Sequence, residues 1–186
     1  MRYIFCLSLL VGAALVLQAV FVPAFLPPVL RPDVCFLIGM AVLAYGSSEM
    51  GWGALFVLGL TSDLVVSGRF GLLTLCYVLA AGAMMVVLAR ELSRSNFGLP
   101  CAAGVAGTVI AHGLYCAFGA FLGLNIGMGR AVGEVFSHAI AAIIWCLPCI
   151  FLTGKVMYHM RVMSPEVQAR WANDERMNDA HKRATA

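Results

Sequence analysis

The sequence predicts an all-α fold, a polytopic membrane bundle of about six transmembrane helices, and the first reason is its composition. Of the 186 residues, 62% are hydrophobic and only 11% are charged, and the mean hydropathy is +0.93. Soluble domains have about half apolar and about a quarter charged residues, so lipid must solvate much of this chain. The second reason is that the apolar residues form separate runs, with polar or helix-breaking residues between them.

The first run extends from about Tyr3 to Leu26. It is longer than the hydrophobic part of a signal peptide, and no small-residue cleavage site follows it, so we interpret it as a retained span. Pro27, Pro28 and Pro32 come next. Because proline lacks the backbone N–H that a helix interior needs, these residues predict a break before the second span.

The next two runs are short for a bilayer: Val34 to Tyr45 and about Gly51 to Val66, with the turn-like Gly46-Ser47-Ser48-Glu49 between them. Two crossings that thin the membrane locally are one interpretation. A re-entrant hairpin that packs against protein is another. One crossing by the whole of residues 34–66 would be too long and too polar, so two segments are predicted.

Three longer spans follow: Gly71 to Ala89, Leu99 to about Asn125, and Val132 to about Thr153, with a kink predicted at Pro148. We assign residues 1–159 to a transmembrane helical domain and residues 160–186 to a charged tail. Ser164-Pro165-Glu166 is typical of a helix start and predicts a short surface helix. The tail is either solvated at the membrane surface or a docking site for a cytoplasmic partner.

The distribution of Lys and Arg predicts which side of the membrane the tail faces. With six spans and the N-terminus inside, the outer loops carry only Arg31, Arg69 and Arg130. Five spans with the N-terminus outside leave the tail on the same side. The C-terminus is therefore predicted to be cytoplasmic, whereas the side of the N-terminus depends on the number of spans. The formal net charge of +3 is too small to indicate a nucleic-acid partner.

Enzyme chemistry finds little support in the sequence. It contains no P-loop, dinucleotide fingerprint, paired catalytic carboxylates or nucleophile–base pair. Seven scattered cysteines do not form a disulfide framework. Only Cys146 and Cys149 have redox-like spacing, and packing beside a proline is the favoured interpretation of that pair. We predict a binding protein that is not an enzyme and needs no cofactor.

Ionisable side chains inside the spans are costly, so each is a functional candidate. Asp63 ends the third run, where it would accept hydrogen bonds from backbone N–H groups at the start of the fourth span, or pair with Arg69. Glu134 and His138 share a helical face and are expected to form a hydrogen-bonded pair. A zinc site there would need a third protein ligand, which no motif supplies. His112 is expected to be a neutral imidazole bonded to a neighbouring helix, and alone it does not form a transporter's polar cluster.

Small residues recur along the fifth span at multiples of four, at Gly107, Ala111, Gly119, Gly123 and Gly127. Such a ridge lets helix backbones approach closely, which drives helix association in lipid. We expect this ridge to contact another helix of the same chain; the alternative is the helix of a separate protein.

Two stretches resemble a known family. The first is Arg31-Pro32-Asp33, directly before an apolar span. The second begins at Gly59 and has a Gly-x-x-x-Asp-Leu and Gly-Leu pattern between two spans, with Gly59, Asp63, Ser67, Gly68 and Gly71. Both are similar to the bacterial rod shape-determining MreD family, over about Leu30 to Val87, and the size and the order of the spans agree along the whole chain.

The resemblance implies a non-enzymatic scaffold subunit of the cell-elongation machinery in the bacterial inner membrane. The implied partner is an MreC-like bitopic protein, and through it actin-like MreB filaments and the synthases of the lateral peptidoglycan wall. The signature residues are expected to hold structure and to do no chemistry. Because the family's fold resembles the substrate-binding subunits of vitamin transporters, the alternative is a small-molecule-binding subunit of a vitamin or metal transporter. Membrane lipid is an expected contact under both interpretations.

Overall fold

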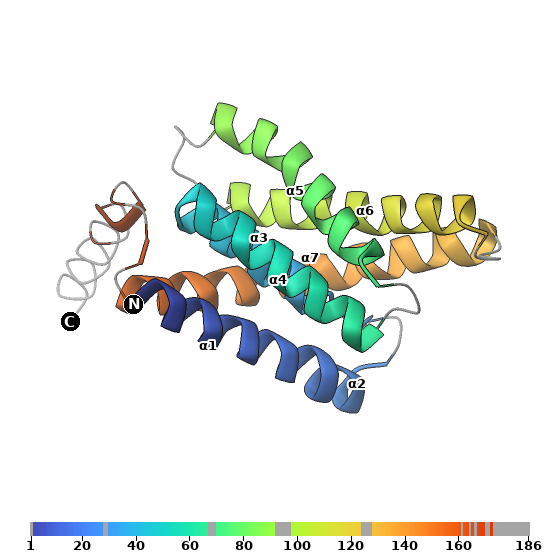
Figure 1. Ribbon diagram of the computed structural model, residues 1–186, viewed down its shortest axis with the longest axis horizontal. Coiled ribbons are helices and arrows are strands. Elements are labelled where there is room, and N and C mark those ends of the chain that lie inside the picture. Colours follow the sequence, from blue (N-terminus) through green and yellow to red (C-terminus); the bar gives the residue numbers. More distant parts are fainter. Residues whose placement is uncertain are drawn as a thin grey trace, which may run out of the picture.

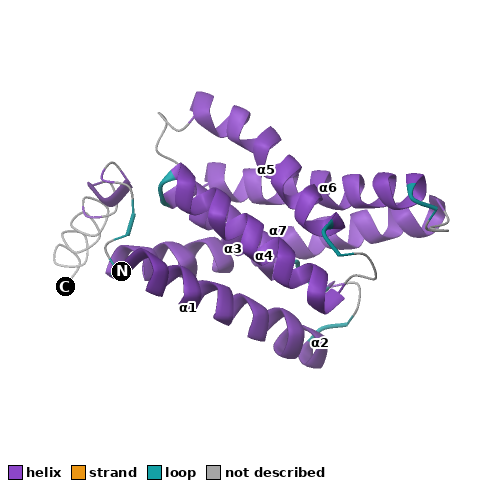
Figure 2. Ribbon diagram, in the orientation of Figure 1, coloured by secondary structure: helices purple, strands orange, loops and turns teal. Residues whose placement is uncertain are grey.

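The computed structural model describes residues 2–27, 30–66, 70–91, 98–123 and 128–160, together with a few residues between 162 and 172. Within these ranges it contains helices and short connections and no strand (Figure 2). The all-α prediction is therefore confirmed for the part of the chain that the structure describes. Most of the charged tail lies outside the described residues. Of its predicted surface helix the structure describes Pro165, Val167 to Ala169 and Ala172, and these residues are helical.

The helical segments follow one another as α1 (Arg2–Val16), the π-helix η1 (Leu17–Phe21), α2 (Val22–Phe25), α3 (Val34–Tyr45), α4 (Ser48–Val66), α5 (Leu72–Glu91), α6 (Gly98–Phe121) and α7 (Met128–His159). They run back and forth along the long axis, so the start of α1 and the end of α7 lie at the same end (Figure 1). The starts of α3, α5 and α7 lie at the opposite end, which we call the distal end.

Three of the described helical segments are long and apolar enough to cross a membrane: Ile4–Phe25, Gly98–Phe121 and Gly129–His159. Two shorter apolar helices, Val34–Tyr45 and Leu72–Val86, accompany them. The chain is thus an α-helical membrane protein. In the last of the long segments the helix continues through Pro148, so this proline does not end it.

The short helix α3 forms the centre of the bundle. Every residue of α3 except Ala44 is buried, and the helix packs against α1, α4, α6 and α7. Its 12 residues span about 18 Å, which is less than the roughly 30 Å hydrocarbon core of a bilayer. Protein rather than lipid covers this helix, which is the condition under which a short or re-entrant segment is tolerated.

Glycines allow α4 to approach its two neighbours closely. A Cβ atom at Gly51 would lie 2.6 Å from the Cα of Leu43 on α3. A Cβ atom at Gly59 would lie 2.8 Å from the Cα of Thr74 on α5. Real Cβ atoms are not found so near a backbone, so both positions exclude any larger residue. Gly59, a signature residue, therefore sets the spacing between α4 and α5.

The first span contains a π-helical turn that its sequence did not predict. Pro23 lacks the N–H that would bond one turn back, and η1 directly precedes the helix that contains it. Single π-turns inside α-helices occur frequently at functional sites. In this chain the turn carries Gln18, whose side chain takes part in the site described below.

Candidate functional site

The carboxylate of Asp33 lies at the centre of a polar group at the distal end. It caps α3, because its Oδ1 accepts the backbone N–H of Phe36 at 3.1 Å. Its Oδ2 accepts the hydroxyl of Tyr77, which reaches across from α5. Asp33 is only 4% exposed and Tyr77 is fully buried. A carboxylate removed from water in this way needs such donors, so Asp33 ties the start of α3 to the second turn of α5.

Two further side chains connect α3 to the first span. The Oε1 of Gln18, in the π-helical turn, accepts the backbone N–H of Val34 at 2.8 Å. The guanidinium of Arg31 donates from Nε to the carbonyl of Leu26 at 3.2 Å and from Nη2 to that of Pro23 at 3.4 Å. These bonds satisfy backbone groups at a helix start and a helix end, which have no partner within their own helices.

Two histidines lie beside Asp33. The Nδ1 of His112 is 3.0 Å from the carbonyl oxygen of Thr108 on its own helix, and its Nε2 is 3.8 Å from Oδ2 of Asp33. His138 comes from α7 and stacks on His112, with ring centroids 3.9 Å apart and an interplanar angle of 27°. The predicted bond to a neighbouring helix is not what the structure shows, because the hydrogen bond of His112 goes to its own helix and Asp33, at the start of α3, lies 3.8 Å away. The structure adds that it belongs to a polar cluster that draws on four helices.

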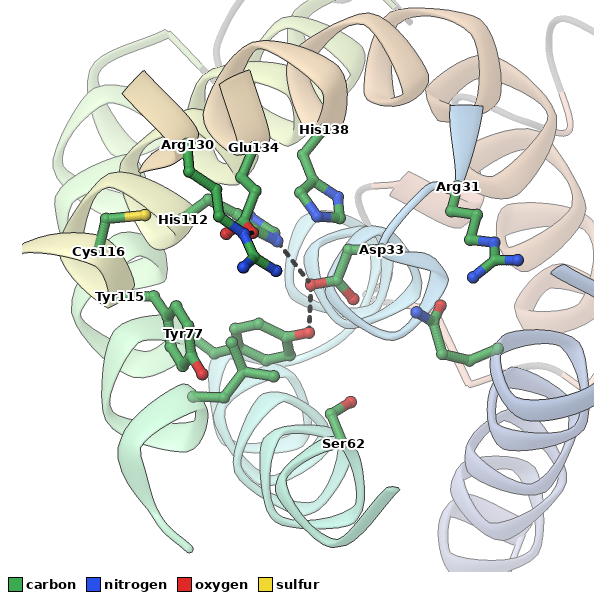
Figure 3. A pocket seen from close by; sticks show the side chains of 12 residues that line it. Arg31, Asp33, Ser62, Tyr77, His112, Tyr115, Cys116, Arg130, Glu134 and His138 are labelled. Carbon is green, nitrogen blue, oxygen red and sulfur yellow. Dashed lines mark hydrogen bonds and ion pairs between the residues drawn. The ribbon is translucent and has the colours of Figure 1, made fainter. Parts of the chain in front are cut away.

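These groups line a cavity of about 610 Å³ (Figure 3). Its lining is Gln18, Arg31, Asp33, Ser62, Leu73, Tyr77, His112, Tyr115, Cys116, Arg130, Glu134 and His138. The first turns of α7 contribute Arg130 and Glu134, and Nε of Arg130 donates to Oε1 of Glu134 at 3.2 Å. The Arg130 side chain is 81% exposed and that of Glu134 is 43% exposed, so this pair lies at the open side of the cavity.

The structure corrects the expectation for Glu134 and His138. They share a helical face, as predicted, but the partners that the structure gives them differ: Arg130 for the carboxylate and His112 for the imidazole. The residues that the structure describes contain no group of three or more His, Cys, Asp or Glu side chains placed to hold a metal ion. What the cavity offers is a mixture of acceptors, donors and aromatic rings for a polar ligand.

Asp63, the other acidic signature residue, organises the start of α5. Its Oδ2 accepts the N–H of Gly71 at 3.0 Å and that of Thr74 at 2.9 Å, and its Oδ1 accepts that of Leu73 at 3.0 Å. These are the predicted hydrogen bonds to the start of the fourth span. Gly71 has φ +91°, a conformation that favours glycine. Arg69, the alternative partner, and the signature residues Ser67 and Gly68 lie outside the described residues.

The predicted small-residue ridge on α6 is only partly a packing surface. Gly107 and Ala111 are buried, and a Cβ at Gly107 would lie 2.9 Å from the ring of Phe36 on α3. Gly119 is also buried. Gly123 instead follows the helix in an exposed turn with φ +77°, because α6 ends at Phe121. Gly127 lies outside the described residues. Gly107 on α6 therefore contacts α3, a helix of the same chain.

A second small-residue surface on α6 was not predicted. We call it the outer face of α6, and it consists of Ala102, Ala106, Val109, Gly113, Ala117 and Ala120. At 100° per residue these positions form one stripe. All are exposed except Gly113, which is half-buried and where an added Cβ would meet nothing within 4 Å. Valine is the largest residue on this stripe.

Large apolar side chains cover the exposed surface elsewhere. On α7 they are Val132, Phe136, Ile140, Ile143, Ile144, Leu147, Phe151 and Leu152. The first span likewise exposes residues such as Phe5, Leu9 and Phe21. The contrast matters because the lipid-facing surface of a span is usually built from bulky apolar residues, whereas small residues concentrate where helices meet.

The contacts of Cys146 agree with the interpretation that this cysteine is a packing residue. All seven are free thiols. Cys146 donates to the carbonyl of Cys101 on α6 at 3.2 Å, and a Cβ at Gly104 would lie 2.8 Å from its sulfur. Cys146 therefore fills the contact between α6 and α7.

Comparison of the chain with models of known families, with curated proteins and with solved structures gave no match.

Proposed function

We propose that this protein is a non-enzymatic scaffold subunit of a bacterial cell-elongation machinery, which binds the transmembrane helix of an MreC-like bitopic partner. In this proposal the chain crosses the inner membrane six times and its C-terminus is cytoplasmic. Lateral peptidoglycan synthesis depends on the assembly, and actin-like MreB filaments and wall synthases join it indirectly.

The outer face of α6 is the observation that carries the proposal. Apolar surfaces of helices gain little from leaving lipid, so association in a membrane depends on close packing and is favoured by small residues. Ala106, Gly113 and Ala117 would let the backbone of a partner helix approach. The bulky face of α7 offers no comparable surface.

The resemblance supports the same proposal, because its signature residues have structural roles. Asp33 caps α3, Asp63 caps α5, and Gly59 sets the distance between α4 and α5. A scaffold needs a rigid arrangement of spans and no reactive group. The signature positions would then hold the partner surface in place from a distance.

The test is a steric block on the outer face. Ala106→Leu and Ala117→Leu should abolish co-purification of a single-span partner at unchanged folded yield. Ala83→Leu is the matched control, because Ala83 is exposed on α5 and receives the same added volume. Retention of the partner by both α6 variants would contradict this binding surface, and loss in the control as well would show a general effect of the added bulk.

The cavity favours a second candidate, a small-molecule-binding subunit of a transporter. Its volume of about 610 Å³ falls within the range of roughly 300–1,000 Å³ typical of ligand pockets. A saturable ligand would raise the unfolding temperature of the purified protein as its concentration increases. A thermal-shift screen of vitamins and metal ions without any saturable stabilisation would remove this candidate.

A further inference from the structure

We propose that the cavity binds a ligand with a primary ammonium group, held between the carboxylate of Asp33 and the imidazole of His112. This inference goes beyond the proposed scaffold function. It concerns the interior of the distal end, whereas the partner surface is the outer face of α6, so each can fail without the other.

The tautomer of His112 determines which of its ring nitrogens can accept a hydrogen bond. Its Nδ1 is 3.0 Å from the carbonyl oxygen of Thr108. A carbonyl oxygen only accepts hydrogen bonds, so Nδ1 must carry the hydrogen. In the neutral imidazole the other nitrogen, Nε2, then has a lone pair and acts as an acceptor.

This acceptor, Nε2 of His112, faces the carboxylate of Asp33. Nε2 of His112 is 3.8 Å from Oδ2 of Asp33, which is too long for a hydrogen bond between them. Both atoms are acceptors and both residues line the cavity, as Figure 3 shows. With the imidazole neutral, two acceptors this close, whose side chains are only 12% and 6% exposed, repel each other unless a donor lies beside them. The hydroxyl of Tyr77 supplies one donor to Oδ2, but none to His112.

A donor that serves both Asp33 and His112 is expected to carry a positive charge. A primary ammonium carries three N–H donors and a positive charge, so it can serve Oδ2 of Asp33 and Nε2 of His112 together. The guanidinium of Arg31 is already directed at two backbone carbonyls. His138 covers one face of His112 by stacking and leaves the ring edge with Nε2 to the cavity.

The open side of the cavity narrows the ligand class further. Arg130 is 81% exposed there, and only its Nε is engaged by Glu134 in the contacts of the described residues. Its remaining donors suit an anionic group near the mouth. The ligand class is therefore a zwitterion whose ammonium enters first and whose phosphate or carboxylate stays near Arg130. The headgroup of phosphatidylethanolamine and a free phosphoethanolamine share this chemistry.

The experiment measures thermal unfolding of the full-length protein in detergent, titrated with phosphoethanolamine and, separately, with phosphocholine. Phosphocholine carries the same phosphate but has no N–H. In parallel, native mass spectrometry records which lipid stays bound after incubation with vesicles of phosphatidylethanolamine, phosphatidylcholine or phosphatidylglycerol. The proposal expects the ethanolamine form to be preferred in at least one of the two measurements. Preference in the lipid assay alone assigns the ligand to the membrane, and saturable binding of the soluble compound assigns it to solution.

Two variants connect that preference to the site. Asp33→Asn keeps an oxygen for the N–H of Phe36 and removes the charge, and should weaken binding roughly tenfold or more, the effect expected of a lost charged hydrogen bond. Arg130→Gln changes an exposed residue and should weaken binding of the zwitterion but not of ethanolamine itself. Lys155→Gln, an exposed cation at the other end of α7, is the control. Equal binding of choline and ethanolamine forms, binding of neither, or no effect of Asp33→Asn in folded protein would overturn the proposal.

Discussion

Asp63 on α4 and Thr74 on α5 are joined by two hydrogen bonds, because both the backbone N–H and the hydroxyl of Thr74 donate to Oδ2 of Asp63. Asp63 is only 2% exposed. With the N–H groups of Gly71 and Leu73, it satisfies the start of α5 from outside that helix. This residue therefore closes the connection between two spans.

Replacement of Asp63 should destabilise the fold. Asp63→Ala leaves several buried N–H groups without a partner, at a cost of about 1–3 kcal/mol for each. We expect a large drop in folded yield and in the unfolding temperature in detergent, and a smaller drop for Thr74→Val, which removes the hydroxyl alone. Normal folded yield of Asp63→Ala with a selective loss of partner binding would show that the structural role is wrong.

Two glycines of α4 should respond oppositely to the same substitution. Gly59→Ala would force a Cβ against the backbone of Thr74, and overpacking of this kind costs about 1–3 kcal/mol. Gly53 has nothing within 4 Å of the corresponding position, so Gly53→Ala should be neutral or slightly stabilising. Thermal unfolding of the two variants, side by side, measures the difference. Equal unfolding temperatures would contradict the close contact of α4 with α5.

Loss of the Tyr77 hydroxyl should loosen the distal end. Tyr77→Phe keeps the ring, which lies against Phe36 with centroids 5.0 Å apart, and removes one donor from Asp33. We expect a loss of about 1–3 kcal/mol, because a buried charged acceptor is left with fewer partners. Tyr158→Phe, on the last turn of α7, is a comparison for the loss of a tyrosine hydroxyl elsewhere. An unchanged unfolding temperature for Tyr77→Phe would exclude a stabilising role for this bond.

The number of crossings can be decided by reporter fusions. Six crossings place both ends of the chain in the cytoplasm, because an even number returns the chain to its starting side. A fluorescent protein that matures only in the cytoplasm should therefore report from either terminus, while a phosphatase active only outside should stay silent. Activity of the phosphatase at the N-terminus with a cytoplasmic C-terminus would instead support five crossings.

Much of the fold could be predicted from the sequence because lipid imposes long apolar runs on each span. The run from Val34 to Tyr45 is the observed range of α3, and Asp63 makes the hydrogen bonds predicted for it. In both cases the signal is local: an apolar run bounded by breakers, and an acid directly before a helix start. The number of membrane crossings stays a prediction.

The cavity could not be predicted because its residues converge from distant parts of the chain. Asp33 and Tyr77 are 44 positions apart, and Tyr77 lies within an apolar run where a tyrosine has no local signal. His112, Glu134 and His138 stand out in the sequence as ionisable groups inside spans, but nothing local shows that they meet Asp33. Gln18 is a further hint, since an amide inside an apolar run needs a partner. The outer face of α6 was not predicted for another reason. The glycines of the predicted ridge lie on one side of the helix, whereas the exposed alanines lie on another.

The central claim is best tested by affinity purification of the tagged, full-length protein in mild detergent, followed by identification of the membrane proteins that co-purify. We predict recovery of a bitopic coiled-coil protein together with wall synthases, and their loss in Ala106→Leu and Ala117→Leu but not in Ala83→Leu. Recovery of an ATPase pair with a coupling subunit would contradict it and assign the protein, with its cavity, to a transporter.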